Sequence, residues 1–361
     1  MSFERGSVSC RFLIAPTQDK FPGDAAQRLA EEAIPAVDNI PPEGCFGWAT
    51  GRHMLDRAIT EETVKVAGML RATLVKAERK IPSALFKAEC RQEEIAAAAA
   101  KGVQFLKREE RKAIAKEVRD RLLPRMPPSL SGIDVVRTDA FVCATATSVA
   151  GCDALVSHWE HAVGQRLIPY LPVVAAMRLG NVDVRTLTAT SFSPDVSNED
   201  VEQDVGTEFL TWVWYFSEAQ GGLNDGFAYA LEGPFTFVHE GKGAHEIVVR
   251  KGNPGVSQEA KAALLAGKKL KKARLTVARG DETWSCSMDG QEWTFGSLKL
   301  PPVEKTDATT MFQERMARLS SFLSAVEGLF RRFVAVRSDP VQWSKETDSV
   351  RQWVSQRTAQ A

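Results

Sequence analysis

Residues Lys76 to Pro128 read KAERKIPSALFKAECRQEEIAAAAAKGVQFLKREERKAIAKEVRDRLLPRMPP, a long stretch that is both basic and rich in helix-forming residues. Five consecutive alanines, Ala96–Ala100, stand among Glu, Lys, Gln and Arg, and all of these residues favour helices. Apolar residues recur at multiples of four and would line one side of a helix: Leu106, Ile114, Val118 and Leu122. Pro124 and the Pro127–Pro128 pair would end it, because proline lacks the amide donor. The stretch therefore predicts a long helical arm.

The arm is a local excess of positive charge in a neutral chain. Between Gly68 and Arg125, fifteen lysines and arginines stand against eight acids, a surplus of +7, whereas the whole chain has 46 of each sign. Such a surplus on one element attracts a polyanion, so we expect nucleic acid as a partner. Four of the bases form a separate line in the sequence pattern: Lys101, Arg108, Lys112 and Arg119. The alternative is a solvated helix whose charges pair with one another, such as Glu109 with Lys112.

Length and composition are those of a globular protein. The chain has 361 residues, of which 44% are hydrophobic and 25% charged. It contains no apolar run near the ~18 residues that span a membrane, and its N-terminus lacks the pattern of a secretory signal. The six scattered cysteines include no CxxC pair and are typical of reduced thiols. We therefore expect a cytoplasmic protein.

The remaining patterns predict an α+β fold with mixed or antiparallel sheets. Strands are expected at 8–15 and 44–50, helices at 24–34, 61–75 and 151–167, and a hairpin that turns at Thr138–Asp139. Composition divides the chain into an N-terminal α+β domain (1–75 with 129–168), the arm (76–128), a C-terminal α+β domain (169–340) and a tail (341–361).

Charge changes sign twice in the C-terminal half. Between Asp195 and Glu246 eleven acids face one lysine, a surplus of −10. This segment holds the aromatic run EFLTWVWYFSE (Glu208–Glu218), which predicts the core of a strand or short helix, with base stacking as the sharper alternative. From Arg250 to Arg279, nine bases and one acid give +8. This second basic block predicts a helix capped at Ser257 and closed by Gly267, then an antiparallel meander. A final helix is expected at 306–336.

No motif in the sequence predicts catalysis. Phosphate-loop, dinucleotide-binding, nucleophile-elbow and HExxH patterns do not occur. His158 and His161, in HWEH, lack further ligands at metal-site spacing. Asp134 and Asp139 are one carboxylate pair without a third partner for a nuclease metal. We therefore expect no enzyme, no cofactor and no metal, and we keep a metal-dependent nuclease or a nuclease accessory as an alternative.

The order of short motifs along the chain resembles the recombination-associated protein RdgC family. The most specific motifs are KIPS (Lys80–Ser83), LLPR (Leu122–Arg125) and the VVRKG…LLAGK block (Val248–Lys268), and the match covers about Gly44 to Val336. The resemblance implies a ring-shaped homodimer that encircles duplex DNA without sequence preference. It also implies binding to single strands, restraint of the recombinase RecA, nucleoid association and no enzymatic activity.

In such a ring, the arm and the second basic block would line the hole, and the acidic segment would face outward or adjoin the dimer contact. Motif match carries over four arm residues as DNA-facing: Lys87, Lys107, Arg108 and Arg125. Charge adds further candidates, which are Lys101, Lys112 and Arg119 in the arm and Lys268, Lys269, Lys271, Lys272 and Arg279 in the second block.

Two departures from the family pattern affect these expectations. Family members often have an aromatic residue just after LLPR that helps lock the arm's dimer contact, and Met126–Pro127–Pro128 stands in its place here. We therefore expect a weaker or different closure between arms. Extra sequence at about 180–246 and beyond Val336 is a candidate partner site. A further alternative is a protein-interaction scaffold whose basic arm binds an acidic partner.

Overall fold

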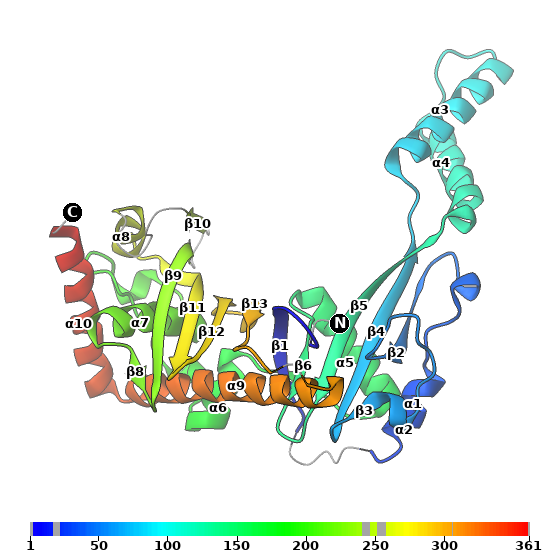
Figure 1. Ribbon diagram of the computed structural model, residues 1–361. Coiled ribbons are helices and arrows are strands. Elements are labelled where there is room, and N and C mark those ends of the chain that lie inside the picture. Colours follow the sequence, from blue (N-terminus) through cyan, green and yellow to red (C-terminus); the bar gives the residue numbers. More distant parts are fainter. Residues whose placement is uncertain (1–2, 17–21, 240–245, 251–257, 305, 360–361) are drawn as a thin grey trace.

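One antiparallel sheet runs through the whole molecule. The computed structural model describes residues 3–16, 22–239, 246–250, 258–304 and 306–359 (Figure 1). The strand order is β10-β9-β11-β12-β13-β1-β6-β5-β4-β2, with β3, β7 and β8 at the margins. The strands are β1 (Val8–Ile14), β2 (Cys45–Thr50), β3 (Lys65–Val66), β4 (Met69–Arg79), β5 (Pro128–Arg137), β6 (Val142–Ala144), β7 (Ile168–Pro169), β8 (Leu223–Asn224), β9 (Phe227–Val238), β10 (Glu246–Val249), β11 (Lys269–Arg279), β12 (Glu282–Asp289) and β13 (Thr294–Lys299). The predicted α+β class with antiparallel pairing is confirmed.

Strand β1 joins the two halves of the chain. It pairs with β13 on one side and β6 on the other, so the first strand bridges C-terminal and N-terminal sequence. The predicted hairpin of β5 and β6 and the predicted meander of β11, β12 and β13 are confirmed. The meander turns at Gly280, whose φ of +56° suits glycine.

The long helix α9 runs beneath the sheet for much of its width (Figure 1). Its buried face includes Phe312, Leu319 and Phe330, which pack into the largest hydrophobic core. The α-helices are α1 (Ala25–Glu31), α2 (Glu61–Val64), α3 (Ser83–Ala100), α4 (Arg108–Leu122), α5 (Val149–Val163), α6 (Pro172–Gly180), α7 (Val205–Ala219), α8 (Gln258–Leu265), α9 (Ala308–Ser338) and α10 (Pro340–Ala359). Short 3₁₀ turns are η1 (Val37–Asn39), η2 (Leu123–Arg125), η3 (Val184–Thr186) and η4 (Asn198–Asp200). Ser257, the expected cap of α8, lies outside the described residues.

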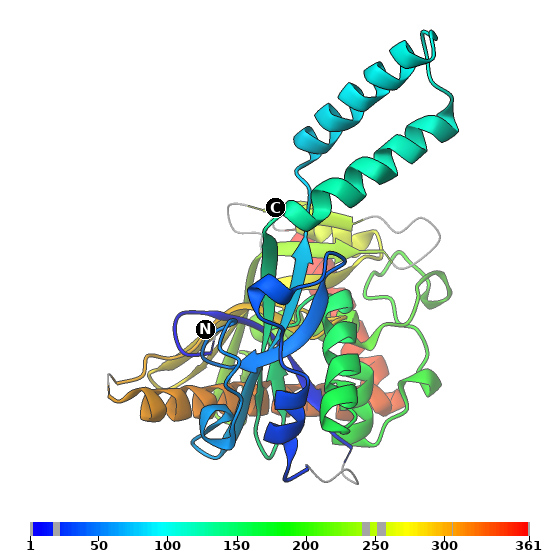
Figure 2. The same cartoon turned by 90° about the vertical axis from the view of Figure 1, so that its right-hand side faces the viewer.

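The arm is a hairpin of two antiparallel helices that projects away from the body (Figure 2). The expectation of one continuous helical arm is wrong in two respects. The chain turns back between α3 and α4, where Gly102 adopts a φ of +63°. The outer ends of the stretch are strands, because residues 76–79 belong to β4 and Pro128 begins β5.

One further sequence expectation is corrected, and another, the buried core helix of the aromatic run, is confirmed. Residues 61–75 form only a four-residue helix before β3 and β4, where the sheet overrides the helix propensity of Leu, Ala, Arg and Lys. The aromatic run of 208–218 lies in α7 and is buried against α9 and α10, so those rings do not face solvent for base stacking. Among the described residues, no helix combines the length and apolarity that crossing a membrane requires.

Candidate nucleic-acid interface

The arm hairpin has a narrow apolar seam. Val118 and Leu122 are buried on α4, whereas α3 buries no residue. Ion pairs also join the two helices: Arg121 of α4 contacts Glu89 at 2.9 Å and Glu93 at 2.7 Å on α3. Because so little of either helix is covered, most arm side chains reach solvent.

Four exposed bases occupy one side of α4, and we call them the cationic flank. They are Arg108, Lys112, Lys116 and Arg119, separated by four, four and three residues, and such steps return to the same side of a helix. Glu109 and Asp120 border this side of α4, because Glu109 lies three residues before Lys112 and Asp120 lies four residues after Lys116. The ion pairs of the two arm helices are made by other bases, Arg91, Lys101 and Arg121. The flank is therefore an exposed row of four cations that is bordered by two acids and makes none of these ion pairs.

The flank is tied to α3 through an aromatic ring. The Arg119 guanidinium lies over Phe86 at 5.7 Å from the ring centroid. Lys87 follows Phe86 in α3 and is exposed, and Arg125 is exposed at the base of the arm. The structure therefore brings most of the predicted arm residues onto one projecting element.

Lys101 and Lys107 lie at the tip, where they hold the turn. Lys101 pairs with Glu110, and the Lys107 amide donates to Glu110 Oε2 at 2.8 Å. The hydrogen bond from Lys101 lowers the pKa of Glu110 below its ordinary value, with the Lys107 amide as a further cause. Lys101 is thus outside the line predicted with Arg108, Lys112 and Arg119, because the chain reverses between them.

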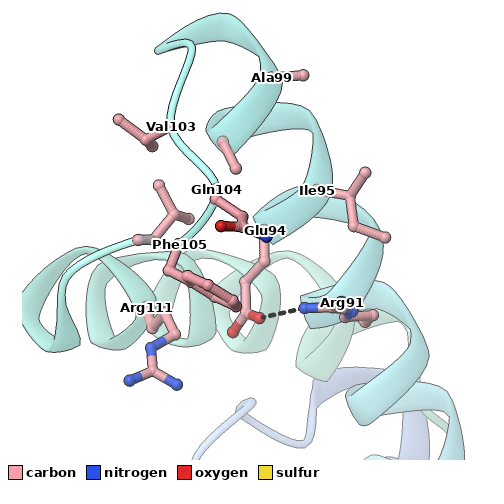
Figure 3. A pocket seen from close by; sticks show the side chains of 10 residues that line it. Arg91, Glu94, Ile95, Ala99, Val103, Gln104, Phe105 and Arg111 are labelled. Atoms are coloured by element: carbon pink, nitrogen blue, oxygen red, sulfur yellow. Dashed lines mark ion pairs between the residues drawn. The ribbon is translucent and has the colours of Figure 1, made fainter.

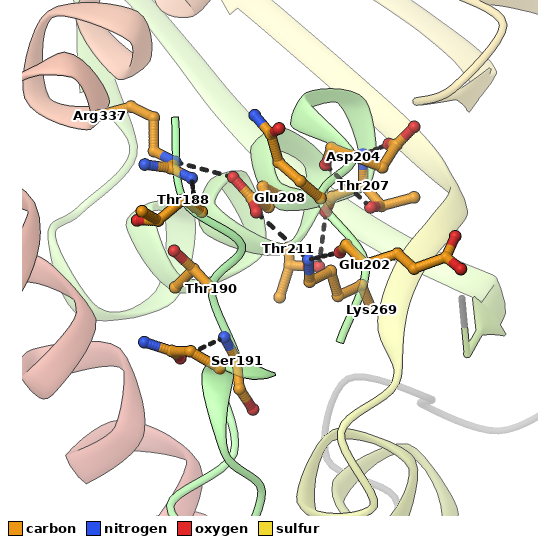
Figure 4. A network of polar contacts seen from close by, with 12 residues as sticks. Thr188, Thr190, Ser191, Glu202, Asp204, Thr207, Glu208, Thr211, Lys269 and Arg337 are labelled. Atoms are coloured by element: carbon orange, nitrogen blue, oxygen red, sulfur yellow. Dashed lines mark hydrogen bonds and ion pairs between the residues drawn. The ribbon is translucent and has the colours of Figure 1, made fainter. Parts of the chain in front are cut away.

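Three bases of the second basic block, Lys269, Lys272 and Arg279, have acidic partners. Lys269 is only 3% exposed, and its ammonium donates to the Glu202 carbonyl at 3.0 Å and to Glu208 Oε1 at 3.2 Å (Figure 4). The expectation that Lys269 faces DNA is wrong, since strand β11 turns this side chain into the core. Lys272 pairs with Asp289 at 3.1 Å, and Lys268 and Lys271 are half-buried.

Arg279 lies at the opposite end of β11 from Lys268 and Lys269. An eleven-residue strand separates its ends by roughly 30 Å. The Arg279 guanidinium pairs with Glu282 at 2.8 Å and lies over the Phe227 ring. The five predicted residues of this block therefore do not form one surface.

The arm tip carries an exposed aromatic residue that sequence reasoning missed. Phe105 is 81% exposed, beside a hollow of about 510 Å³ lined by Ile95, Ala98, Ala99, Val103 and Leu106, with Arg91 and Arg111 at its charged side (Figure 3). The signal was available, because Val103 and Phe105 are apolar residues in a short turn between charged helices. Met126, which directly follows the LLPR motif, lies at the base of the arm beside η2.

The carboxylates and histidines considered for metal chemistry have structural partners. The Thr73 hydroxyl donates to Asp134 at 2.9 Å, and Asp139 is exposed in the β5–β6 turn. His158 stacks on Phe46, and partial burial lowers its pKa, whereas His161 lies 3.4 Å from Glu32. Over the described ranges, no three His, Cys, Asp or Glu side chains gather as a metal site would require.

No family model matches the chain, and no curated protein matches it. Function must therefore be argued from the arm and its charges.

Proposed function

We propose that this chain is a sequence-independent DNA-binding protein that acts as a ring-shaped homodimer around duplex DNA. In this proposal it also binds single strands, and it modulates homologous recombination in the nucleoid by limiting the access of RecA. The observation that carries the proposal is the cationic flank of α4, which projects from a chain whose charges sum to zero.

The dimensions of the flank suit a phosphate backbone. Eleven residues separate Arg108 from Arg119, which corresponds to about 17 Å of helix at 1.5 Å per residue. Duplex DNA presents one phosphate per 3.4 Å of axis on each strand, so several phosphates lie within that length. Lysine and arginine contacts to phosphates carry no base information, and this accounts for the expected indifference to sequence.

Self-association is supported by the shape of the chain and by its arm tip. The arm and the end of the sheet that carries β10 and α8 rise from the same side of the molecule, which gives the chain the outline of an open U (Figure 1). Phe105 and the apolar residues Ile95 and Val103 of the adjoining mixed hollow could meet their counterparts in a two-fold contact between identical arms. A second copy that closes the U would enclose a space lined by both arms.

A DNA titration at several salt concentrations tests the binding proposal. Wild type should bind duplexes of unrelated sequence with equal affinity and weaken steeply as salt rises. The flank variant Arg108→Glu/Lys112→Glu/Arg119→Glu should bind roughly a hundredfold more weakly, and its slope of log K against log salt should fall by about three.

The matched control is Arg52→Glu/Arg166→Glu/Lys299→Glu, which changes net charge equally at exposed positions off the arm. The control should bind nearly as wild type does. Equal losses in the two variants would mean that overall charge, and not the flank, drives binding, and the proposal would fail.

Sedimentation tests the dimer separately. Phe105→Ser should shift the protein toward monomer, whereas Leu223→Ser, at a residue 65% exposed on the body, should not. If both variants sediment as wild type does, closure through the arm tip is excluded.

A further inference from the structure

A polar hollow lies at the elbow between α9 and α10, and we call it the elbow hollow. Its volume is about 430 Å³, and its walls are the end of α9, the first turns of α10 and the segment 186–198. Hydroxyl and guanidinium groups dominate the lining, with Thr188, Thr190, Ser344, Thr347, Arg337 and Arg351 among them.

Arg337 brings a buried guanidinium to this hollow. The residue is 3% exposed, its Nε donates to Glu208 Oε2 at 2.8 Å, and its Nη2 donates to the Thr188 carbonyl at 2.5 Å (Figure 4). Its guanidinium also lies over the Trp343 ring at 4.7 Å. A guanidinium has five N–H donors, so these two hydrogen bonds leave donors for a further acceptor.

The charge behind the hollow is unbalanced. Glu208 is fully buried and accepts from Lys269 as well as from Arg337, so two cations share one carboxylate. Buried charges are normally paired, because removing an ion from water is costly. The surplus positive charge of this trio lies beside the hollow, where an anion would balance it.

Arg351 adds a second guanidinium from α10. It donates to the Ser191 carbonyl at 3.0 Å and to Asn198 Oδ1 at 3.1 Å, which fastens the segment 186–198 across the elbow. Its one carboxylate neighbour in the hollow, Asp348, lies 3.8 Å away and is 72% exposed. Thr347 is 5% exposed, and within the part of the chain that the structure describes its hydroxyl oxygen has no hydrogen-bond partner.

We propose that the elbow hollow binds the phosphate group of a small molecule, with Arg337 and Arg351 as its charged partners. Its volume falls within the range of small-molecule sites, about 300–1,000 Å³, so there is room for a phosphate and an attached body. The site belongs to the C-terminal half of the chain and is independent of the arm, so it goes beyond DNA binding.

Calorimetric titration tests the site, with inorganic phosphate, AMP and adenosine as probes at constant ionic strength. The full chain with the flank variant is titrated beside wild type, so that phosphate held by the arm is separated from phosphate held at the elbow. Phosphate should bind wild type and the flank variant with the same affinity, and so should AMP. Adenosine should bind neither protein. An AMP affinity at least tenfold above that of phosphate would identify a phosphorylated small molecule as the ligand, and equal affinities would identify free phosphate.

Two variants locate the site. Ser344→Glu places a carboxylate in the hollow and should abolish binding, whereas Ser349→Glu adds the same charge elsewhere on α10 and should preserve it. Arg351→Gln should weaken binding by about tenfold, as expected for the loss of a charged hydrogen bond. Absence of phosphate and AMP binding to wild type would overturn the proposal, and so would equal losses in Ser344→Glu and Ser349→Glu. Because the flank variant is titrated too, failure here leaves the DNA-binding proposal intact.

Discussion

Two regions of this chain carry almost the same surplus of positive charge, and the fold treats them in opposite ways. Residues 68–125 sum to +7 and residues 250–279 to +8. In the first region, the bases of the cationic flank are exposed on a thin helical hairpin. In the second, Lys269 is buried and Lys272 and Arg279 have acidic partners.

The difference follows from the elements that hold the charges. A two-helix hairpin covers only one stripe of each helix, so bases elsewhere on it reach water. Strand β11 alternates its side chains between two faces, and one of these packs against α7 and the hydrophobic core. A basic run on such a strand must place some of its charges inside, where each requires a partner.

The largest effect should come from the buried carboxylate of the second region. Glu208→Gln removes the negative charge shared by Lys269 and Arg337 and leaves two cations in the core. We expect a loss of about 3–5 kcal/mol in the free energy of unfolding, measured by urea denaturation. Glu109→Gln, on the exposed arm, should change it by less than about 0.5 kcal/mol. If the two substitutions change the free energy of unfolding equally, burial does not make the Glu208 charge more important than an exposed one.

DNA affinity should separate the two regions next. Lys271→Glu/Lys272→Glu/Arg274→Glu reverses as many charges as the flank variant, on a strand where Lys272 pairs with Asp289 and Arg274 lies opposite Glu232. We expect it to weaken duplex binding by less than about fivefold, against roughly a hundredfold for the flank variant. Filter binding at low salt measures both. If the β11 variant loses as much duplex affinity as the flank variant does, the second basic block also contacts DNA.

Truncation of a buried side chain should show whether the arm unfolds independently of the sheet. Val118→Ala on α4 and Val277→Ala on β11 each remove two buried methyl groups, at an expected cost of about 1–3 kcal/mol. Hydrogen exchange should increase only within the arm for Val118→Ala and throughout the sheet for Val277→Ala. If Val118→Ala accelerates exchange across the sheet, the arm does not unfold independently.

The smallest effect should be a loosening of the arm tip in acid. Since the pKa of Glu110 is lowered in the folded chain, its stabilising effect is present above the ordinary carboxylate pKa. That effect is lost as the pH falls through the lowered value. The protection factors of amides 101–107, measured by NMR and corrected for the intrinsic pH dependence of exchange, should fall in wild type between pH 6 and pH 3 and be low throughout in Glu110→Gln. A pH-independent tip would show that the Lys101–Glu110 contact contributes nothing.

Local sequence signals predicted much of the fold and the exposed half of the candidate site. The alanine run and the spacing of the charged residues predicted the arm helices, and turn residues predicted the β5–β6 hairpin and the meander. The turn at Gly102 was missed because Leu106 was grouped with the apolar line of α4, although it precedes that helix.

The buried part of the site could not be predicted in the same way. Lys269 is adjacent in sequence to other lysines, but its partner Glu208 is 61 residues away. Only the packing of α7 on β11 brings the two together, and a single sequence does not encode that contact in any local pattern. For the same reason, residues 65–79 looked helical by propensity, while their pairing with β2 and β5 makes them strand.

The ladder between β4 and β5 has a mechanical consequence. These strands pair without interruption from Leu70–Arg137 to Arg79–Pro128, and both lead directly into the arm. A pull on the arm along this direction draws both strands the same way, so it loads in shear the ladders that join them to β2 and β6, whose hydrogen bonds share the force. The arm is thus firmly anchored in the sheet, and a force applied to it passes to the strands on either side of β4 and β5.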